Sequence, residues 1–209
     1  MNRKWQKTGC WCVLFVGLFW LGACSPTGSI YLQPGKGGQE PPVSTVRPVV
    51  QLELFEEKFD TGEVIGGHFF RAERQLLKVE EQEVARTLRR MIAQRLAEKN
   101  IPFTYGDEWN RTLVGLERIE PPVQVVVDGR ISRLWLEVKS GLTHTNYQID
   151  LEIACRLGVV PKEEVVSRTV HVSEEMIKFS SQPAVMEELV NKSLAEAAGQ
   201  IVLKITESI

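Results

Sequence analysis

Cysteines, histidines and paired carboxylates are the side chains of this 209-residue chain that could carry chemistry. Cys24 has the most distinctive context, because it ends the stretch LFWLGAC, where an apolar run gives way to a polar segment. A thiol in such a place could form a disulfide, bind a metal or be a point of covalent attachment. The residues that precede it decide between these roles.

The N-terminus has the layout of a secretory signal peptide. Arg3, Lys4 and Lys7 come first, and an apolar run from Cys10 to Trp20 follows them. A basic start, a short apolar core and small residues before a cleavage point are typical of such signals. The run is shorter than the roughly 20 residues that a transmembrane helix needs. We therefore expect residues 1–23 to be removed, the alternative being an anchor helix that stays uncut.

The tetrapeptide Leu21-Gly22-Ala23-Cys24 resembles the lipobox of bacterial lipoproteins. In that family the signal is cut just before the cysteine, and the thiol carries the lipid. The resemblance therefore implies that Cys24 is the lipidated residue, and that acyl chains such as palmitate anchor the protein to the membrane. Ser25 takes the place of the Asp that usually means inner-membrane retention. This implies a lipid-anchored protein of the outer membrane that faces the periplasm.

The other candidate chemical groups favour structural roles. With Cys10 and Cys12 in the signal and Cys24 lipidated, only Cys155 remains, so no internal disulfide can form. Cys155 falls on the apolar register of a predicted strand, where a thiol is inert. The sequence lacks a phosphate loop, a GxSxG motif and a CxxC motif, and its histidines have no partner at metal-ligand spacing (His68, His144 and His171). We expect no catalytic activity, no metal and no cofactor.

Composition bounds the rest of the chain. Apolar residues make up 43% and charged residues 25%, which is typical of a globular protein. The net charge of −2 lacks the basic excess of nucleic-acid-binding proteins, so nucleic acid is not an expected partner. Proline and glycine are frequent in residues 24–45, which predicts a flexible tether. Residues 46–209 are then expected to form a single α/β domain of the envelope.

Hydrophobic periodicity predicts the elements of this domain. Residues 79–100 form a helical pattern with one apolar stripe, and a second helical pattern begins near Ser181. Alternating or apolar runs predict strands at the start of the domain, at 101–105, in 123–140, in 145–157 and in 164–173. Strands joined by short turns pair antiparallel, and both helices must bury a stripe. The expected fold class is α+β, a two-layer sandwich of a mainly antiparallel sheet with two amphipathic helices on one face.

The region from Val46 to Ile205 resembles the YajG family of bacterial outer-membrane lipoproteins. The resemblance rests on the lipobox, the strand-helix-strand start, the strand pair YQIDLEIACRL and VSRTVHVS, and the closing helix VNKSLAEAAGQIVLKI. The lipopolysaccharide-assembly lipoprotein LptE has a similar order of elements. The YajG resemblance implies no established activity and no binding residue.

One face of the predicted sheet could be a contact surface. Counting by two along RISRLWLEVKS turns Leu134 and Leu136 inward and Trp135 outward among charged neighbours. The connection GDEWNRT adds Trp109 and Arg111, and aromatic residues are enriched at protein contacts. The alternative is that this connection folds over the sheet and buries Trp135 in a second small core.

These features predict a non-catalytic binding or assembly module whose partner is another envelope protein. The alternative is an accessory or carrier protein for lipid or lipopolysaccharide at the outer membrane. The predicted first helix offers basic residues for such a ligand (Arg86, Arg89, Arg90 and Arg95). A solvated helix face explains the same residues more simply.

Overall fold

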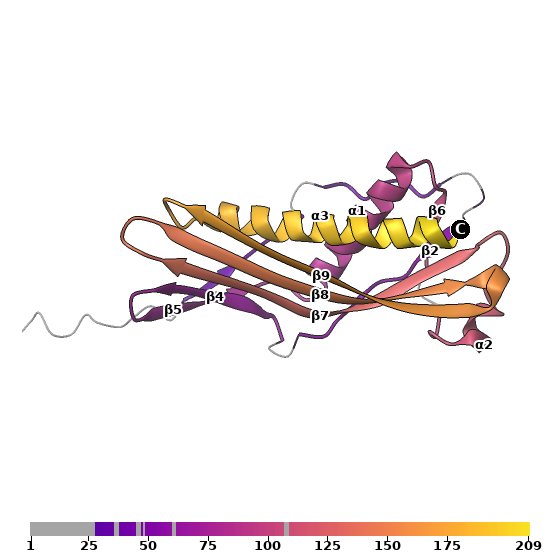
Figure 1. Ribbon diagram of the computed structural model, residues 1–209, viewed down its shortest axis with the longest axis horizontal. Helices are drawn as coiled ribbons and strands as arrows, with labels where there is room; N and C mark the ends of the chain where they lie inside the picture. Colours follow the sequence, from indigo (N-terminus) through magenta and orange to yellow (C-terminus); the bar gives the residue numbers. More distant parts are fainter. Residues whose placement is uncertain (1–27, 36–37, 45–46, 48, 60–61, 107–108) are drawn as a thin grey trace, which may run out of the picture.

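The computed structural model of the protein describes residues 28–35, 38–44, 47, 49–59, 62–106 and 109–209. The predicted signal peptide and Cys24 lie outside these residues. The centre of the fold is a long antiparallel ribbon of three strands, β7 (Val125–Ser140), β8 (Thr145–Val159) and β9 (Glu164–Lys178) (Figure 1). The sequence predicted strands in all three places.

Strand β8 shows why the ribbon forms here. Its apolar residues alternate with polar ones, and the apolar set is buried (Tyr147, Ile149, Leu151, Ile153, Cys155 and Leu157). A period of two places one set on each face of a sheet. The short turn 141–144 joins β7 to β8, and the 3-10 helix η1 (Val160–Lys162) lies between β8 and β9.

Strand β7 is continuous through Asp128-Gly129, a residue pair that is common in turns. The irregularity lies further on, where Ile131 pairs with Ile153 and Arg133 pairs with Glu152. Ser132 is therefore one extra residue in β7, a β-bulge, and its hydroxyl donates to the carbonyl oxygen of Glu152 at 3.2 Å. Because of the bulge, the side chains of β7 that point away from the helices have even residue numbers before Ser132 and odd residue numbers after it.

The sheet is mixed, and the prediction of a mainly antiparallel sheet was wrong. On the other side of β7, three short strands follow one another in parallel with it: β2 (Val50–Leu52), β3 (Glu56–Glu57) and β4 (Val64–Phe70). One chain segment thus runs alongside β7 in the same direction. Strand β6 (Phe103–Tyr105) returns after a helix to pair in parallel with β2, and β5 (Glu73–Lys78) forms a hairpin with β4. None of the strands predicted from the sequence covers β4 or β5.

Part of the predicted tether is folded. Strand β1 (Ser29–Tyr31) pairs in parallel with β5, and Leu32, which follows it, is 1% exposed. The amide N–H of Gly35 also donates to the side-chain oxygen of Asn191 at 2.8 Å. The apolar pair Ile30 and Leu32 supplies the burial that holds this segment, within a stretch whose proline and glycine content had suggested a flexible chain.

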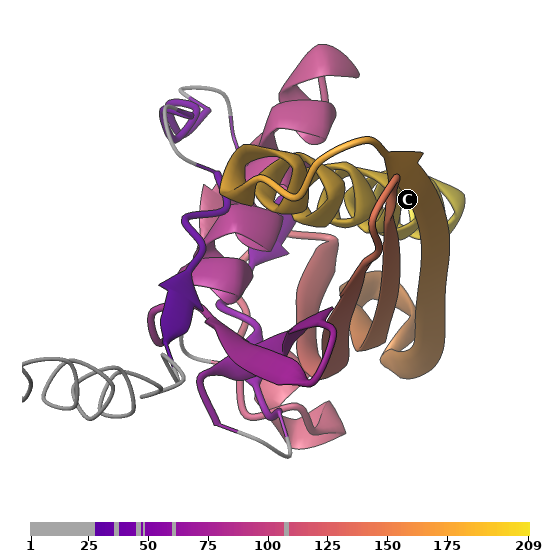
Figure 2. The same ribbon diagram turned by 90° about the vertical axis from the view of Figure 1, so that its left-hand side faces the viewer.

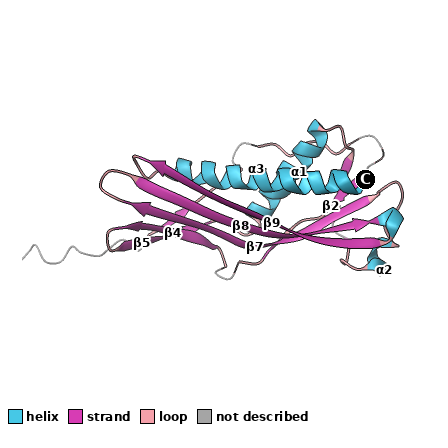
Figure 3. Cartoon of the chain, in the orientation of Figure 1, coloured by secondary structure: helices cyan, strands magenta, loops and turns pink. Residues whose placement is uncertain are grey.

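Two long helices cover one face of the sheet, as the sequence predicted, and the α+β class is confirmed. Helix α1 (Glu83–Glu98) buries the stripe of Val84, Leu88, Ile92 and Leu96, and α3 (Pro183–Ser208) packs against α1 and the ribbon. The strands curl around this helical layer (Figure 2). A third helix, α2 (Leu113–Leu116), lies at the end of the ribbon far from the turn 141–144, where the sequence indicated only a long connection (Figure 3).

Candidate binding surface on the sheet

The face of β7–β9 that is turned away from α1 and α3, here called the outer face, is polar along most of its length. Successive cross-strand rows place Arg133 beside Glu152 and His171, and Trp135 beside Asp150 and Ser173. Most of the β9 residues in this register are exposed (Ser167, Thr169, His171, Ser173, Glu175 and Ile177). The outer face therefore offers side chains from three long strands to a partner.

A second small core covers one end of the outer face. Trp109, Leu116, Val123 and Val126 are buried together there, apart from the main core. The indole N–H of Trp109 donates to the carbonyl oxygen of Thr112 at 3.2 Å. Trp109 is 6% exposed, so in this structure its ring packs inside the protein rather than at the surface.

Trp135 has the orientation that the sequence predicted. Its neighbours Leu134 and Leu136 are buried in the main core, while Trp135 is half-buried on the outer face. The long connection thus builds its core around Trp109, whereas the alternative prediction placed Trp135 in it. The contact role of Trp135 stays a prediction.

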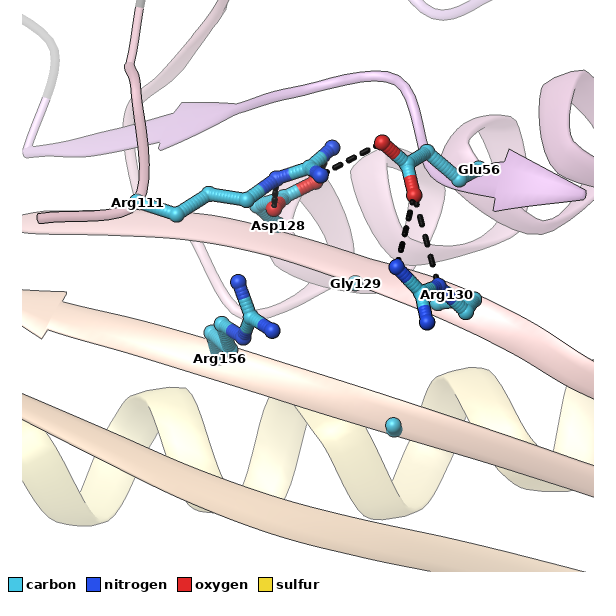
Figure 4. A pocket seen from close by; sticks show the side chains of 7 residues that line it. Glu56, Arg111, Asp128, Gly129, Arg130 and Arg156 are labelled. Atoms are coloured by element: carbon cyan, nitrogen blue, oxygen red, sulfur yellow. Dashed lines mark hydrogen bonds and ion pairs between the residues drawn. The ribbon is translucent and has the colours of Figure 1, made fainter.

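Arg111 belongs to a group of ionisable side chains, here called the charged cluster, on the outer face beside the second core. Its guanidinium donates to Glu56 at 2.5 Å and forms an ion pair with Asp128 (Figure 4). The other carboxylate oxygen of Glu56 accepts from Arg130 at 3.3 Å, and Arg156 completes the cluster from β8. The cluster lines a cavity of about 50 Å³.

Burial and pairing shift the two carboxyl groups of the cluster in opposite directions. Hydrogen bonding from Arg111 lowers the pKa of Glu56, although partial burial opposes the shift. Burial raises the pKa of Asp128, and the N–H of Gly129 and the charge of Arg111 oppose that shift. Asp128 is only 2% exposed, so it depends on Arg111 for its neutralising charge.

Arg156 is the unpaired member of the charged cluster. Its guanidinium lies near the other side chains, without a hydrogen bond or ion pair to any residue that the structure describes (Figure 4). Three arginines and two carboxylates leave the cluster with an excess of positive charge. A carboxylate of a partner protein is the kind of group that a half-buried arginine binds well.

The sequence identified Arg111 but missed the rest of the cluster. A detectable signal was present, since Asp128 and Arg130 are two residues apart in the otherwise apolar first part of the strand, 125–131, and must share a face. Glu56 gave no such signal, because its place beside Arg130 follows from the parallel pairing of β3 with β7.

The basic residues of α1 are largely occupied within the protein. Arg90 donates to the carbonyl oxygens of Gly35 and Gly38 at 3.0 and 2.9 Å. Arg89 lies over the ring of Tyr105 at 4.7 Å and pairs with Glu40 at 3.6 Å. These arginines therefore hold Gly35, Gly38 and Glu40 against the helix. Arg86 pairs with Glu83 on the same helix at 3.8 Å.

The groups considered for chemistry have structural surroundings. Burial raises the pKa of Cys155 to about 12, so its thiol is protonated at neutral pH. His68 bonds to the hydroxyl of Ser140 at 2.8 Å. Among the described residues, no group of three or more metal-ligating side chains is arranged to hold an ion. No helix in the described ranges has the length and apolarity to cross a membrane.

No family model and no curated protein matches this chain. Among solved structures, it is similar to a protein of family DUF330 from Xanthomonas campestris, with a TM-score of 0.48 and 11% identity, over 83% of this chain and 93% of that one. It is also similar to a minor lipoprotein from Acinetobacter baumannii, with a TM-score of 0.38 and 9% identity, over 75% of this chain and 92% of that one. The structural neighbours thus include bacterial lipoproteins.

Proposed function

We propose that this protein is a bacterial envelope lipoprotein, anchored through an acylated Cys24, that acts as a non-catalytic binding or assembly module. It belongs in the outer membrane, faces the periplasm and is of the YajG type. The lipobox and the absence of an Asp after Cys24 support the location. Its partner is another protein of the envelope.

The observation that carries the binding role is the outer face of β7–β9, which is open except at the end that the second core covers. Helices α1 and α3 cover only the opposite face, and β9, with 15 residues, pairs only with β8 among the described strands. An open strand edge can accept a strand from a partner, because its unpaired N–H and C=O groups are already aligned. The charges along β9, such as Arg168 and Glu174, oppose indiscriminate pairing of this edge with other chains.

Two side chains give the outer face its specificity. Trp135 supplies apolar area in the middle of a polar surface, as many energetically dominant contact residues do. Arg156 supplies a guanidinium that is unpaired among the described residues and lies six residue pairs away along the ribbon, roughly 20 Å. The partner surface therefore carries an apolar pocket and a carboxylate at that separation.

The carrier alternative has less support. A basic patch for lipid or lipopolysaccharide needs free cations. Arg89 is paired with Glu40, Arg90 donates to backbone carbonyl oxygens of the preceding segment, and Arg86 pairs with Glu83. We therefore prefer a protein partner. Binding of labelled lipopolysaccharide that is lost on replacing Arg89 and Arg90 would reverse this preference.

Site-specific photo-crosslinking in intact cells tests the proposal. A photoreactive amino acid at His171 on the outer face should give a discrete adduct with one envelope protein, whereas the same group at Glu188 on exposed α3 should not. Arg156→Glu should reduce the His171 adduct at least several-fold, since it reverses the charge offered to the partner. Equal adducts from His171 and Glu188 would contradict the assigned surface.

The substitution Trp135→Ala distinguishes a role of Trp135 in partner contact from a role in the packing of the core. We expect it to weaken capture of the same partner about tenfold, which corresponds to about 1.4 kcal/mol. The free energy of unfolding should fall by at most about 1 kcal/mol, because the ring is half-buried on an open sheet face. A large loss of stability would show that Trp135 is a core residue instead.

Incorporation of radiolabelled palmitate tests the anchor independently. The wild-type protein should take up the label, and Cys24→Ser should abolish it. A purified protein that starts at Met1 and carries no label would contradict the proposed location.

A further inference from the structure

Three turns meet at one end of the sheet. Ser140 of β7 pairs with both Phe70 of β4 and Thr145 of β8, and Thr145 pairs with Lys178 of β9. The turns 71–72, 141–144 and 179–182 that follow or precede these residues therefore lie at the same end of the molecule, on the left in Figure 1 and toward the viewer in Figure 2. We call this the anchor end.

The start of the described chain is tied to the same end. Ser29 pairs with Leu76 of β5, Leu76 pairs with Gly67 of β4, and Gly67 pairs with Glu137 of β7. Ser29 therefore lies at the level of Glu137, about 10 Å along the strand direction from Ser140. Strand β1 runs parallel to β5, away from the anchor end. Cys24 precedes Ser29 by five residues, which span at most about 18 Å when fully extended. An acyl chain on Cys24 thus keeps the bilayer close to this part of the molecule.

Large apolar side chains are exposed at the three turns. Phe179 is 96% exposed and Leu142 is 87% exposed, so they protrude almost completely into solvent. Ile177 and Phe70 are 64% and 38% exposed at the adjoining strand ends. Single exposed apolar residues are common on proteins, but several at the tips of neighbouring turns mark a surface that enters an apolar medium or meets a partner.

The charges at these turns indicate whether the exposed apolar side chains meet a partner or enter a bilayer. The segments 70–74, 141–144 and 177–182 contain Arg71, Arg74 and Lys178, and Glu73 is their one acidic residue. The guanidinium of Arg71 lies 5.2 Å from the centre of the Phe70 ring. Basic residues next to protruding apolar ones suit the headgroup region of an anionic bilayer, where each basic residue adds attraction.

We propose that the anchor end is a membrane-docking surface, which inserts Leu142 and Phe179 into the headgroup region of an anionic bilayer. The inference rests on the proposed lipid anchor for its direction, since the reach of Cys24 selects this end. The docked domain then stands with β7–β9 pointing away from the membrane, so that the charged cluster faces the periplasm at a distance.

Vesicle binding by the protein without its acyl chains tests the inference. The chain from Ser25 onward contains every described residue and lacks the lipid. It should sediment with vesicles of equal parts phosphatidylethanolamine and phosphatidylglycerol, and less with phosphatidylcholine alone. The double variant Leu142→Ser/Phe179→Ser should lower the partition coefficient about tenfold or more, because two apolar side chains no longer leave water.

The matched control is Leu113→Ser/Val114→Ser on α2 at the other end. These side chains are 54% and 58% exposed, so the change also removes exposed apolar surface, but away from the anchor end, and should leave binding unchanged. Equal loss in both double variants, or no vesicle binding by the wild type, would overturn the docking surface. Melting temperatures of all variants should agree, which excludes unfolding as the cause.

The test of the docking surface and the test of the lipid anchor can fail independently. Absence of palmitate with intact, turn-dependent vesicle binding would overturn the lipid anchor and leave the docking surface standing. Palmitate incorporation together with vesicle binding that is unchanged in Leu142→Ser/Phe179→Ser would overturn the docking surface and leave the lipid anchor standing. Self-association of the wild type through these turns, seen by sedimentation without vesicles, would also overturn the docking surface.

Discussion

At the scale of single residues, Arg111 is the group on which the charged cluster depends. Its backbone has a positive φ of 66°, a conformation that costs about 1–3 kcal/mol for a residue other than glycine. This backbone places the guanidinium between Glu56 and Asp128. The ion pairs offset the cost, because Asp128 would otherwise be a buried carboxylate without a countercharge.

We predict that Arg111→Met destabilises the protein in a pH-dependent way. Burial already raises the pKa of Asp128 and Arg111 opposes it, so the variant should raise that pKa further. A folded-state pKa above the unfolded one means that the folded protein holds more protons, and stability falls as the pH rises through that range. The loss should be about 2–3 kcal/mol at pH 7, below the roughly 3–5 of a fully buried pair, and should shrink toward pH 4. Urea unfolding across this pH range measures it.

Glu56 also makes the loss of stability in Arg111→Met larger at neutral pH than at acidic pH. Its pKa is lowered in the folded protein, so its contribution is present above the unfolded value and is lost as the pH falls through the folded one. The double variant Arg111→Met/Asp128→Asn is the control, because it removes the buried charge together with its partner. It should recover most of the stability at neutral pH; a double variant as unstable as Arg111→Met would show that Asp128 is not the cause.

At the scale of elements, Gly158 decides whether the connection 109–116 can lie on the ribbon. A Cβ atom at this position of β8 would be 2.4 Å from Cδ2 of Leu116 and 3.0 Å from the ring of Trp109. Only a residue without a side chain lets the second core form over β8. The connection thereby holds Arg111 beside Asp128.

We predict that Gly158→Val expels the second core. Overpacking should lower stability by about 1–3 kcal/mol. Trp109 should become exposed, and in a Trp135→Phe background it is the one tryptophan after Cys24, so a red shift of its fluorescence reports the change.

Gly199→Ala is the control for this substitution. Gly199 lies inside α3, and an added Cβ would meet Arg95 at an ordinary 3.5 Å. Alanine in a helix interior is more stable than glycine by about 0.5–1 kcal/mol, so this variant should gain stability and keep the emission unchanged. An unshifted spectrum in Gly158→Val would contradict the packing described for 109–116.

At the scale of the whole molecule, the ribbon separates the anchor end from the charged cluster. From Asp128 to Ser140, β7 extends about 40 Å. If the anchor end rests on the bilayer, the charged cluster lies about that far into the periplasm. A membrane-bound protein would in this way offer the outer face to a partner beyond the headgroups.

We predict that membrane contact is confined to the anchor end. The acylated protein, labelled with a fluorophore through Leu142→Cys or Glu163→Cys, should be reconstituted in vesicles with spin-labelled lipid. Emission should be quenched at position 142, whereas position 163, about 45 Å away along β9, should be unaffected. Cys155 should stay unlabelled, because its thiol is buried and protonated. Equal quenching at both positions would mean that the domain lies flat on the membrane.

Local patterns in the sequence predicted much of the fold. The alternation from Tyr147 to Leu157 predicted β8 and the inward position of Cys155, and the stripe from Val84 to Leu96 predicted the buried face of α1. The first pattern repeats every two residues, as in a strand, and the second every three to four, as in a helix, so each can be read within a single element. Strand β1 gave a weaker signal, because only Ile30 and Leu32 supply it within a proline- and glycine-rich stretch.

The sequence by itself determined the alternating strands, the helical stripes and the outward direction of Trp135, and it carries the resemblance of Leu21-Gly22-Ala23-Cys24 to a lipobox, because each depends on residues close together in the chain. Only the tertiary structure decided the parallel pairing of β2, β3 and β4 with β7, the burial of Trp109 and the meeting of Glu56, Arg111 and Asp128. It also decided that three distant turns share one end of the sheet. Those arrangements depend on which strand each segment pairs with, and the burial of an apolar face is satisfied by more than one such pairing.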